Sequence, residues 1–252
     1  RQAEKQTMKY AIIAAGNGSR LAKEGVTAPK PLVKVNGERL IDRLVRVFCN
    51  NNATEIVVIC NEEMTDVQEH LAHIQQHGLA GKDVPLRFVV KSTPSSMHSF
   101  AELSQWLTDE PFVLTTVDTI FREDEFKAYI DAFTQATANS VQAYMGVTAY
   151  IDDEKPLYVG TDEQRNITGF YDQNEADCTY ISGGIYGLHP QTLRTLDDCM
   201  QRGESRMRNF QRALIADGRK AVAHPFTKVL DIDHASDIEK AEQFLNGTVC
   251  GR

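Results

Sequence analysis

Short apolar runs alternate with longer amphipathic segments through the first half of the chain. The apolar runs are rich in Val, Ile and Phe, which favour strands, and they cover Tyr10–Ala15, Glu55–Cys60, Leu86–Lys91, Phe112–Val117 and Val141–Thr148. Apolar residues recur at helical spacing in Leu40–Asn51, Glu63–His77, Ser99–Leu107 and Glu123–Ala136. Strands that alternate with helices predict an α/β fold with a mostly parallel central sheet flanked by helices.

The pattern changes after Asp152. Short strands with turn signals are expected at Leu157–Thr161, Ile167–Tyr171 and Tyr180–Leu188, and helices near Gln191–Met200 and Met207–Ala216. A strand at Ala221–Pro225, the segment Val229–Asp233 and a helix over Ala235–Leu245 return to the α/β pattern. No linker or repeat divides the chain, so we expect a single domain over residues 1–252, with a small β-rich insertion or lid and a sub-lobe over residues 152–190.

Composition and charge narrow the possible partners. The chain has 252 residues and a formal net charge of -8, which argues against binding to nucleic acid, because that binding needs clustered Lys and Arg. No apolar stretch approaches the roughly 20 residues that span a bilayer, so we expect no membrane partner. The five cysteines are widely spaced and form no CxxC pair, which predicts free thiols in the reducing cytoplasm.

A glycine loop, Gly16-Asn17-Gly18-Ser19-Arg20-Leu21, follows the first predicted strand. Such a loop can direct several N–H groups at phosphate oxygens, although a glycine turn alone is equally compatible with a structural role. Arg20 adds a guanidinium suited to bidentate phosphate contact, and Lys30 adds a second cation between Pro29 and Pro31. The combination indicates a phosphate site. It is neither a dinucleotide fingerprint, since Leu21 replaces the third small residue, nor a Walker loop.

These two boxes resemble those of the nucleotidyltransferase superfamily that includes the sugar-1-phosphate nucleotidyltransferases, whose signature is AAGxGxRL followed by PKPL. The resemblance implies a Rossmann-like, GT-A-like fold. It also implies that the loop binds the nucleoside triphosphate through Ala14, Ala15, Gly16, Asn17, Gly18, Ser19 and Arg20. Arg20 and Lys30 are the implied catalytic residues, Arg20 on the leaving pyrophosphate and Lys30 on the phosphates in the transition state.

Two acidic positions are candidate metal ligands. Asp118 follows an apolar strand, and the open edge of an α/β sheet is where ligands bind. Asp231 lies in a segment that resembles the family's second metal-binding box. We expect Asp118 and Asp231 to hold Mg²⁺ together with substrate phosphates. A helix cap is the alternative for Asp118, and for Asp233 a cap shared with Ser236 is favoured over a role behind the metal ligands.

Two further segments are candidates for substrate contacts. Ser182–Tyr186 resembles the family's N-A-G-I-Y, which implies an acceptor pocket lined by Gly183, Gly184 and Tyr186, although a turn or bulge would explain the glycines equally well. Ser95 and Ser96 can donate hydrogen bonds to a base or phosphate, or belong only to a loop and helix cap. The family's Glu-Lys-Pro is missing, since Tyr171-Asp172-Gln173 stands in its place.

The resemblance implies a Mg²⁺-dependent nucleotidyltransferase. It would move a nucleoside monophosphate from a nucleoside triphosphate to a sugar-1-phosphate or similar small phosphorylated acceptor and release pyrophosphate, with residues 152–190 helping to bind the acceptor. Phosphocholine or another phospho-alcohol as acceptor, a non-catalytic nucleotide-binding relative and, less favoured, a glycosyltransferase are the alternatives. His70, His73 and His77 are interpreted as a polar helix face rather than a metal site.

Overall fold

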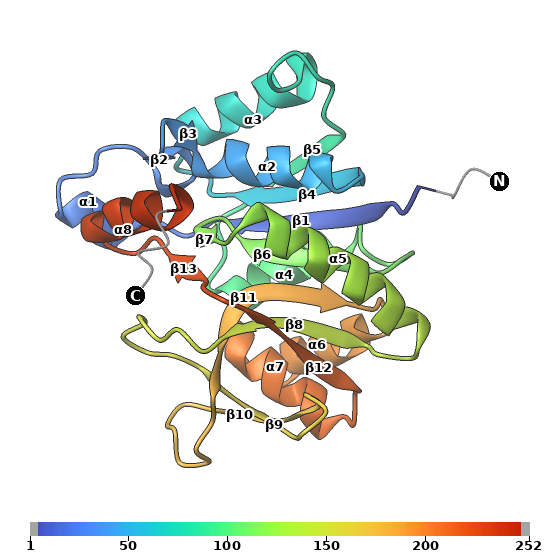
Figure 1. The fold of residues 1–252 in the computed structure, drawn as a ribbon. Coiled ribbons are helices and arrows are strands. Elements are labelled where there is room, and N and C mark those ends of the chain that lie inside the picture. Colours follow the sequence, from blue (N-terminus) through green and yellow to red (C-terminus); the bar gives the residue numbers. More distant parts are fainter. Residues whose placement is uncertain (1–4, 248–252) are drawn as a thin grey trace.

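A computed structural model describes residues 5–247 of the chain, and a nine-stranded sheet runs through this part (Figure 1). The strands of this sheet are β1 (Met8–Ala14), β4 (Ala53–Cys60), β5 (Leu86–Val90), β6 (Phe112–Thr116), β8 (Ala143–Thr148), β9 (Tyr158–Thr161), β10 (Ile167–Tyr171), β11 (Tyr180–Leu188) and β12 (Ala221–Phe226). Two short pairs lie outside it: β2 (Lys34–Val35) with β3 (Glu38–Arg39), and β7 (Thr119–Ile120) with β13 (Leu230–Asp231).

The helices mostly match the segments predicted from apolar periodicity. They are α1 (Ser19–Lys23), the 3₁₀ turn η1 (Lys30–Leu32), α2 (Leu40–Asn50), α3 (Thr65–His77), α4 (Ser96–Ser104), α5 (Glu123–Ala138), α6 (Thr192–Gln201), α7 (Met207–Ala216) and α8 (Ala235–Leu245). The start of α4 differs from the prediction. It begins at Ser96 rather than Ser99, because the Ser95 side chain accepts a hydrogen bond from the backbone N–H of His98 and caps the helix.

The sheet has a parallel half, in the order β5-β4-β1-β6, in which every neighbouring pair runs in the same direction. Beyond β6 comes the antiparallel β11, followed by β8 and β12, and the hairpin β9–β10 pairs with the start of β11. The predicted α/β class and mostly parallel sheet are confirmed. The hairpin and the long loop before it form the β-rich insertion.

The chain reverses its direction of travel across the sheet at β1. It moves from β1 outward to β4 and β5 and then returns to β6 on the other side of β1, where Ile13 pairs with Thr116. β1 and β6 are parallel neighbours, so the loops that follow them begin side by side at the carboxyl edge of the sheet. From there the chain continues in opposite directions across the sheet. Such a point at the carboxyl ends of parallel strands is where open α/β sheets bind their ligands.

Both faces of the sheet are buried, and β1 shows this by alternation. Tyr10 and Ile12 pack with α2, α3, α5 and α8, whereas Ala11 and Ile13 pack with α4, α6 and α7. In α5, Phe126, Tyr129, Ile130 and Phe133 form the buried stripe, and the acidic first turn complements the helix dipole. Helices packed on both faces hold the strands in position, and the strands in turn position the loops at the carboxyl edge of the sheet.

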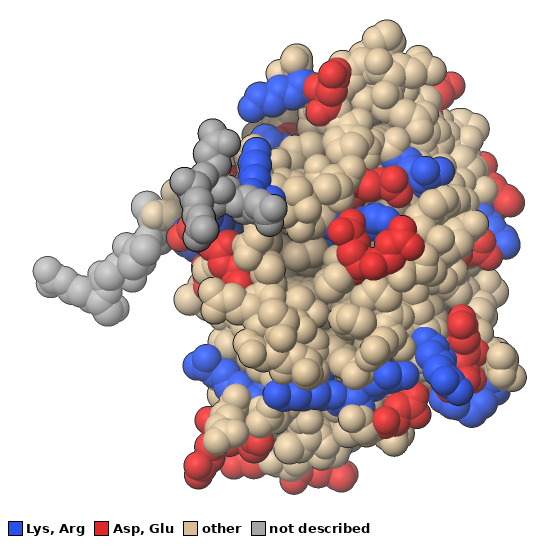
Figure 2. Space-filling model, turned by 90° about the vertical axis from the view of Figure 1, so that its right-hand side faces the viewer, with Lys and Arg blue, Asp and Glu red and all other residues tan. Residues whose placement is uncertain are grey.

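Positive and negative side chains are mixed on the side of the molecule where β1 begins. Figure 2 views the side from which the chain enters β1, and there Lys and Arg groups lie beside Asp and Glu groups. Within the described residues, no helix is long and apolar enough to cross a membrane.

Candidate active site

A pocket of about 400 Å³ opens where β1 and β6 end, and we call it the loop pocket. It joins residues predicted from different motifs, because its walls include Ala14, Ala15, Gly16, Asn17, Ser95, Ser96, Lys30 and Asp118. Of the loop Gly16–Arg20, which was expected to share a crevice with Lys30 and Asp118, only Gly16 and Asn17 line this pocket. Gly18 and Ser19 do not line it, since Gly18 caps α1 from a left-handed conformation with φ 61° and Ser19 is the first residue of that helix.

Lys30 connects two distant acidic residues. Its ammonium group donates to Asp118 Oδ2 at 3.2 Å and to Asp233 Oδ1 at 3.3 Å. The 3₁₀ turn that carries Lys30 approaches the glycine loop so closely that a Cβ on Gly18 would lie 3.4 Å from the Lys30 Cβ. Burial would lower the pKa of Lys30, but the charges of Asp118 and Asp233 outweigh burial and raise it, so the side chain stays protonated.

The two predicted metal ligands are neighbours because of a short strand pair. Asp231 on β13 pairs with Thr119 on β7, and the backbone N–H of Ile232 donates to the carbonyl of Asp118 at 3.2 Å. Asp118 lies two residues after the end of β6, so this pairing places both carboxylates at the ligand-binding edge. The distance of 113 residues between them in the sequence gives no hint of this contact.

Asp231 lies in a strongly acidic environment. The side chain of Asp231 is open to solvent but lies deep within the cleft. Desolvation by the surrounding protein, followed by the charges of Asp118 and Asp233, raises the pKa of Asp231. Carboxylates crowded in this way repel one another until a cation binds between them. Oxygen ligands of this kind suit Mg²⁺. Within residues 5–247, no three His, Cys, Asp or Glu side chains group to hold a metal.

A second pocket, of about 340 Å³, lies beside the first and is called the α7 pocket here. Ser96, Thr116 and Asp118 line both pockets, so the two form one cleft. Gly184 and Tyr186 line the α7 pocket as predicted for an acceptor site. Asp153, Lys155 and Ser182 come from the segment 152–190 that was expected to help bind the acceptor, whereas Arg206, Arg208 and Gln211 of α7 were not predicted from the sequence.

The glycines of β11 form a β-bulge. The pairing of β11 with β8 shifts between Ser182 and Ile185, and Gly184 has φ 72°. A Cβ on Gly184 would lie 3.3 Å from Thr119 Oγ1, and one on Gly183 would lie 3.1 Å from the carbonyl oxygen of Gly146. The structural alternative for these glycines is thus confirmed, while the acceptor contact stays a prediction.

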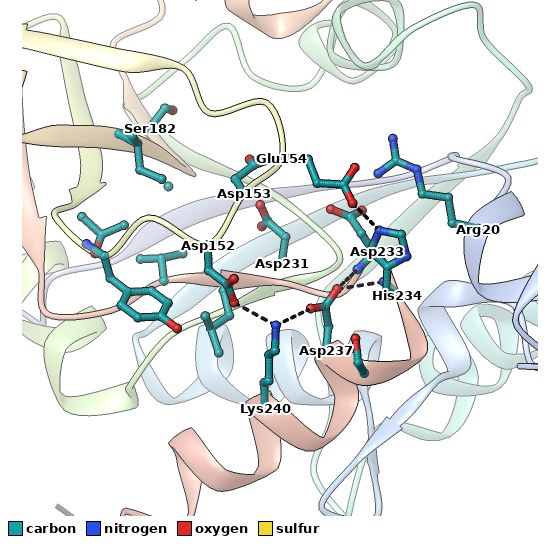
Figure 3. Close-up of a pocket in the computed structure, with 17 residues that line it drawn as sticks. Arg20, Asp152, Asp153, Glu154, Ser182, Asp231, Asp233, His234, Asp237 and Lys240 are labelled. Carbon is teal, nitrogen blue, oxygen red and sulfur yellow. Dashed lines mark hydrogen bonds and ion pairs between the residues drawn. The ribbon is translucent and has the colours of Figure 1, made fainter. Parts of the chain in front are cut away.

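A third pocket, of about 250 Å³, lies over the start of α8 (Figure 3). This α8 pocket shares Asp231, Asp233, Asp153 and Ser182 with the α7 pocket and also contains Gly183. Arg20 lines the α8 pocket rather than the loop pocket, at the right-hand edge of Figure 3. The structure therefore does not bring Arg20 to the same wall as Lys30, and its contact with pyrophosphate stays a prediction.

The capping interpretations of two acidic residues are wrong. Helix α5 begins at Glu123 after Arg122, so Asp118 caps no helix. Asp233 binds Lys30 instead of capping α8 with Ser236. The cap comes from Asp237, whose Oδ2 accepts from the backbone N–H groups of Asp233 and His234 at 3.0 and 2.8 Å. Asp233 thus belongs to the charged centre of the cleft.

The fold and this charged centre define a nucleotidyl transferase. The family model for nucleotidyl transferases matches residues 9–247, and the chain belongs to that family. The glucose-1-phosphate cytidylyltransferase of Salmonella typhimurium is 21% identical over 208 residues, which are 76% of this chain and 79% of that protein.

Solved structures show the same fold. A candidate glucose-1-phosphate thymidylyltransferase from Bacillus anthracis superposes with a TM-score of 0.81 at 20% identity, covering 98% of both chains. The inositol-1-phosphate CTP transferase from T. maritima gives a TM-score of 0.76 at 18% identity, covering 96% of this chain and 99% of that one.

Proposed function

We propose that this protein transfers a nucleoside monophosphate from a nucleoside triphosphate to a sugar 1-phosphate or a similar small phosphorylated acceptor and releases pyrophosphate. One observation carries the proposal. Lys30, Asp118 and Asp231 gather where the loop pocket meets the α7 pocket, so a nucleotide in one and an acceptor in the other would meet at this charged centre.

The loop pocket supplies the groups that a triphosphate needs. A Cβ at Gly16 would meet nothing within 4 Å, so the backbone at this position is open to a ligand. Ser95 and Ser96 line the same pocket and offer hydroxyls. Lys30 keeps its positive charge where the loop pocket meets the α7 pocket. Arg20 would bind the leaving pyrophosphate from the α8 pocket, which shares residues with the α7 pocket.

Asp118 and Asp231 would hold Mg²⁺, and their adjacent, mutually repelling carboxylates fit that role. When bound, Mg²⁺ supplies positive charge that offsets the charge of the phosphates during the exchange. Lys30 adds a preplaced ammonium whose effect is greatest as charge is redistributed on the α-phosphate. Asp233 orients Lys30 through the 3.3 Å hydrogen bond.

The acceptor needs no dedicated base. A phosphate monoester has a second pKa of about 6, so its oxygen is already ionised at neutral pH and can attack the α-phosphorus directly. The bond from the α-phosphorus to the bridging oxygen breaks, and the electron pair leaves with pyrophosphate. Positioning and electrostatics therefore carry the reaction.

The segment 152–190 supports the expected acceptor sub-lobe within a single domain, since it supplies Asp153, Lys155, Ser182 and Tyr186 to the α7 pocket. The free thiols of Cys49, Cys60, Cys178 and Cys199 fit the cytoplasmic location that we propose, and Cys250 lies outside the described residues.

A screen of pyrophosphate release tests the proposal. Each nucleoside triphosphate would be incubated with Mg²⁺ and a panel of acceptors that contains hexose 1-phosphates, inositol 1-phosphate and phosphocholine. We expect release that requires both a triphosphate and an acceptor. Release that is independent of every acceptor, or absent from every pair, would refute it.

A further inference from the structure

A buried asparagine, Asn61, joins three segments at the carboxyl edge of the sheet. It directly follows β4 and lines the loop pocket. Its Nδ2 donates to the carbonyl oxygen of Ala15 at 3.1 Å, and its Oδ1 accepts from the backbone N–H of Glu63 at 2.8 Å and from the hydroxyl of Ser92 at 3.1 Å. The sequence did not single out Asn61, because an asparagine after a strand is an ordinary turn residue.

An amide side chain matches this set of partners. The N–H of Glu63 is a donor and the carbonyl of Ala15 is an acceptor, so the side chain between them must accept at one end and donate at the other. These partners also fix which end of the Asn61 amide is Oδ1 and which is Nδ2. An aspartate has the same shape, but when ionised it only accepts, and it would turn an oxygen toward the carbonyl oxygen of Ala15. The position therefore distinguishes Asn from Asp.

The bond to Ala15 sets the orientation of the first peptide of the glycine loop. The Ala15 carbonyl and the Gly16 N–H belong to one planar trans peptide and point in opposite directions, so anchoring the oxygen also sets the direction of the N–H. Within residues 5–247, the Gly16 N–H donates to no protein acceptor, and a Cβ on Gly16 would meet nothing within 4 Å. Gly16 also lines the loop pocket, so its N–H is free to donate to a bound phosphate oxygen.

Glycine makes this peptide easy to turn over. Turning it over changes mainly ψ of Ala15 and φ of Gly16, and a glycine adopts either sign of φ. The Ala15 carbonyl oxygen would then lie where the N–H had been, and it would repel the negative charge of a phosphate. The bond from Asn61 holds the peptide in the orientation that presents the donor.

The bond to Ser92 extends the link to another wall of the loop pocket. Ser92 directly precedes residues 93–96, all of which line this pocket. Its Oγ accepts from the backbone N–H of Glu62 at 3.2 Å while it donates to Asn61. Asn61 therefore connects the glycine loop with the segment after β5 and holds these two walls of the pocket relative to each other.

We propose that Asn61 is a positioning residue for the nucleoside triphosphate, which it acts on through the peptide between Ala15 and Gly16. The inference rests on the proposed function and adds to it a residue outside the two boxes of the glycine loop and Lys30. Asn61 lines the loop pocket but not the α7 pocket, so its effect should fall on the nucleotide and not on the acceptor.

Steady-state kinetics with the best pair of substrates test this role. We expect Asn61→Asp to raise the KM for the nucleotide about tenfold, with little change in kcat or in the KM for the acceptor. The matched control is Asn139→Asp. Nδ2 of Asn139 also donates to a backbone carbonyl, that of Gln135 at 2.9 Å, but at the exposed end of α5, so this variant should behave as wild type.

A second variant, Ser92→Ala, separates positioning from folding. It removes one donor to Oδ1 of Asn61, leaves the bond to Ala15 in place and changes an exposed residue. We expect a smaller rise in the KM for the nucleotide, and no further rise when Ser92→Ala is added to Asn61→Asp, because both substitutions act on one link. Nucleotide KM values within about twofold of wild type in both single variants would overturn the role, and so would an equal rise in the KM for the acceptor or effects that multiply in the double variant.

If no pair of substrates releases pyrophosphate, the proposed function fails separately. Calorimetric titration with ATP, CTP, GTP, UTP and dTTP in the presence of Mg²⁺ then decides the role of Asn61. We expect Asn61→Asp to weaken the binding of the preferred triphosphate about tenfold. A wild type that binds none of the five, or an Asn61→Asp variant that binds as tightly as the wild type, would refute the role.

Discussion

The ammonium of Lys30 lies 3.2 Å from the carboxylate of Asp118, across 88 residues of sequence. The contact joins the Pro29–Leu32 box to the segment that follows β6. It forms because β1 and β6 are neighbours and their loops leave the sheet at one edge. The chemistry that we propose depends on this junction.

Replacing Lys30 by Ala should lower kcat about 10²-fold, with a smaller change in the KM for the nucleotide, because a preplaced charge is worth most in the transition state. Steady-state kinetics in both substrates measure the split. Lys34→Ala removes an exposed lysine nearby and serves as the control. An unchanged kcat with only a raised KM would mean that Lys30 merely attracts substrate.

Asp118→Asn and Asp231→Asn should each abolish most turnover while leaving the fold intact. Lys30 keeps its partner Asp233 in both variants, and each substitution relieves repulsion in the carboxylate cluster. Mg²⁺ with nucleotide should raise the Tm of the wild type but not of the variants, since binding to the native state stabilises it. The control Asp197→Asn should behave as wild type. Normal Mg²⁺-dependent turnover in both variants would overturn the metal assignment.

The two loop glycines should respond differently to alanine. Gly16 has room for a Cβ, so Gly16→Ala should keep the wild-type Tm but raise the KM for the nucleotide if phosphate approaches the backbone there. Gly18 has φ 61°, so Gly18→Ala should cost about 1 kcal/mol in stability from strain alone. Thermal melts and kinetics separate the effects. A Gly16→Ala enzyme with unchanged kinetics would place the phosphates elsewhere.

Stability at acid pH should depend on His224. Burial, followed by the charge of Arg165, lowers the pKa of this ring, whose Nδ1 lies 2.7 Å from the hydroxyl oxygen of Tyr144. A base with a depressed native pKa binds its proton more readily when unfolded, so stability falls as pH drops below about 6.5, the ordinary histidine value. Melts of wild type and His224→Asn between pH 8 and 5 should show a smaller fall in Tm for the variant. Parallel curves would contradict this.

Apolar periodicity in the sequence predicted most of the fold. The stripe Phe126–Phe133 and the strands of the sheet bury their apolar faces as expected, so periodicity sufficed there. The hairpin β2–β3 was missed, although Asn36-Gly37, with φ of 52° and 76°, is a recognisable turn signal. Its two-residue strands are too short to show alternation.

The candidate site was predicted only where local motifs carry it. Lys30, Asp118 and Asp231 sit in recognisable boxes, and the structure brings them together. Arg206 and Arg208 carry no such signal, because their place in the cleft arises from the packing of α7 against the sheet and from the bonds to Ser95 and Ser96.

Transfer of label from a nucleoside triphosphate labelled at the α-phosphorus tests the central claim most directly. The enzyme would be incubated with this substrate, Mg²⁺ and the best acceptor, and the products separated by chromatography. We predict that the α-label appears in a nucleotide–acceptor conjugate in an amount equal to the pyrophosphate released. Recovery of the label only in free nucleoside mono- or diphosphate, with no conjugate, would contradict the account.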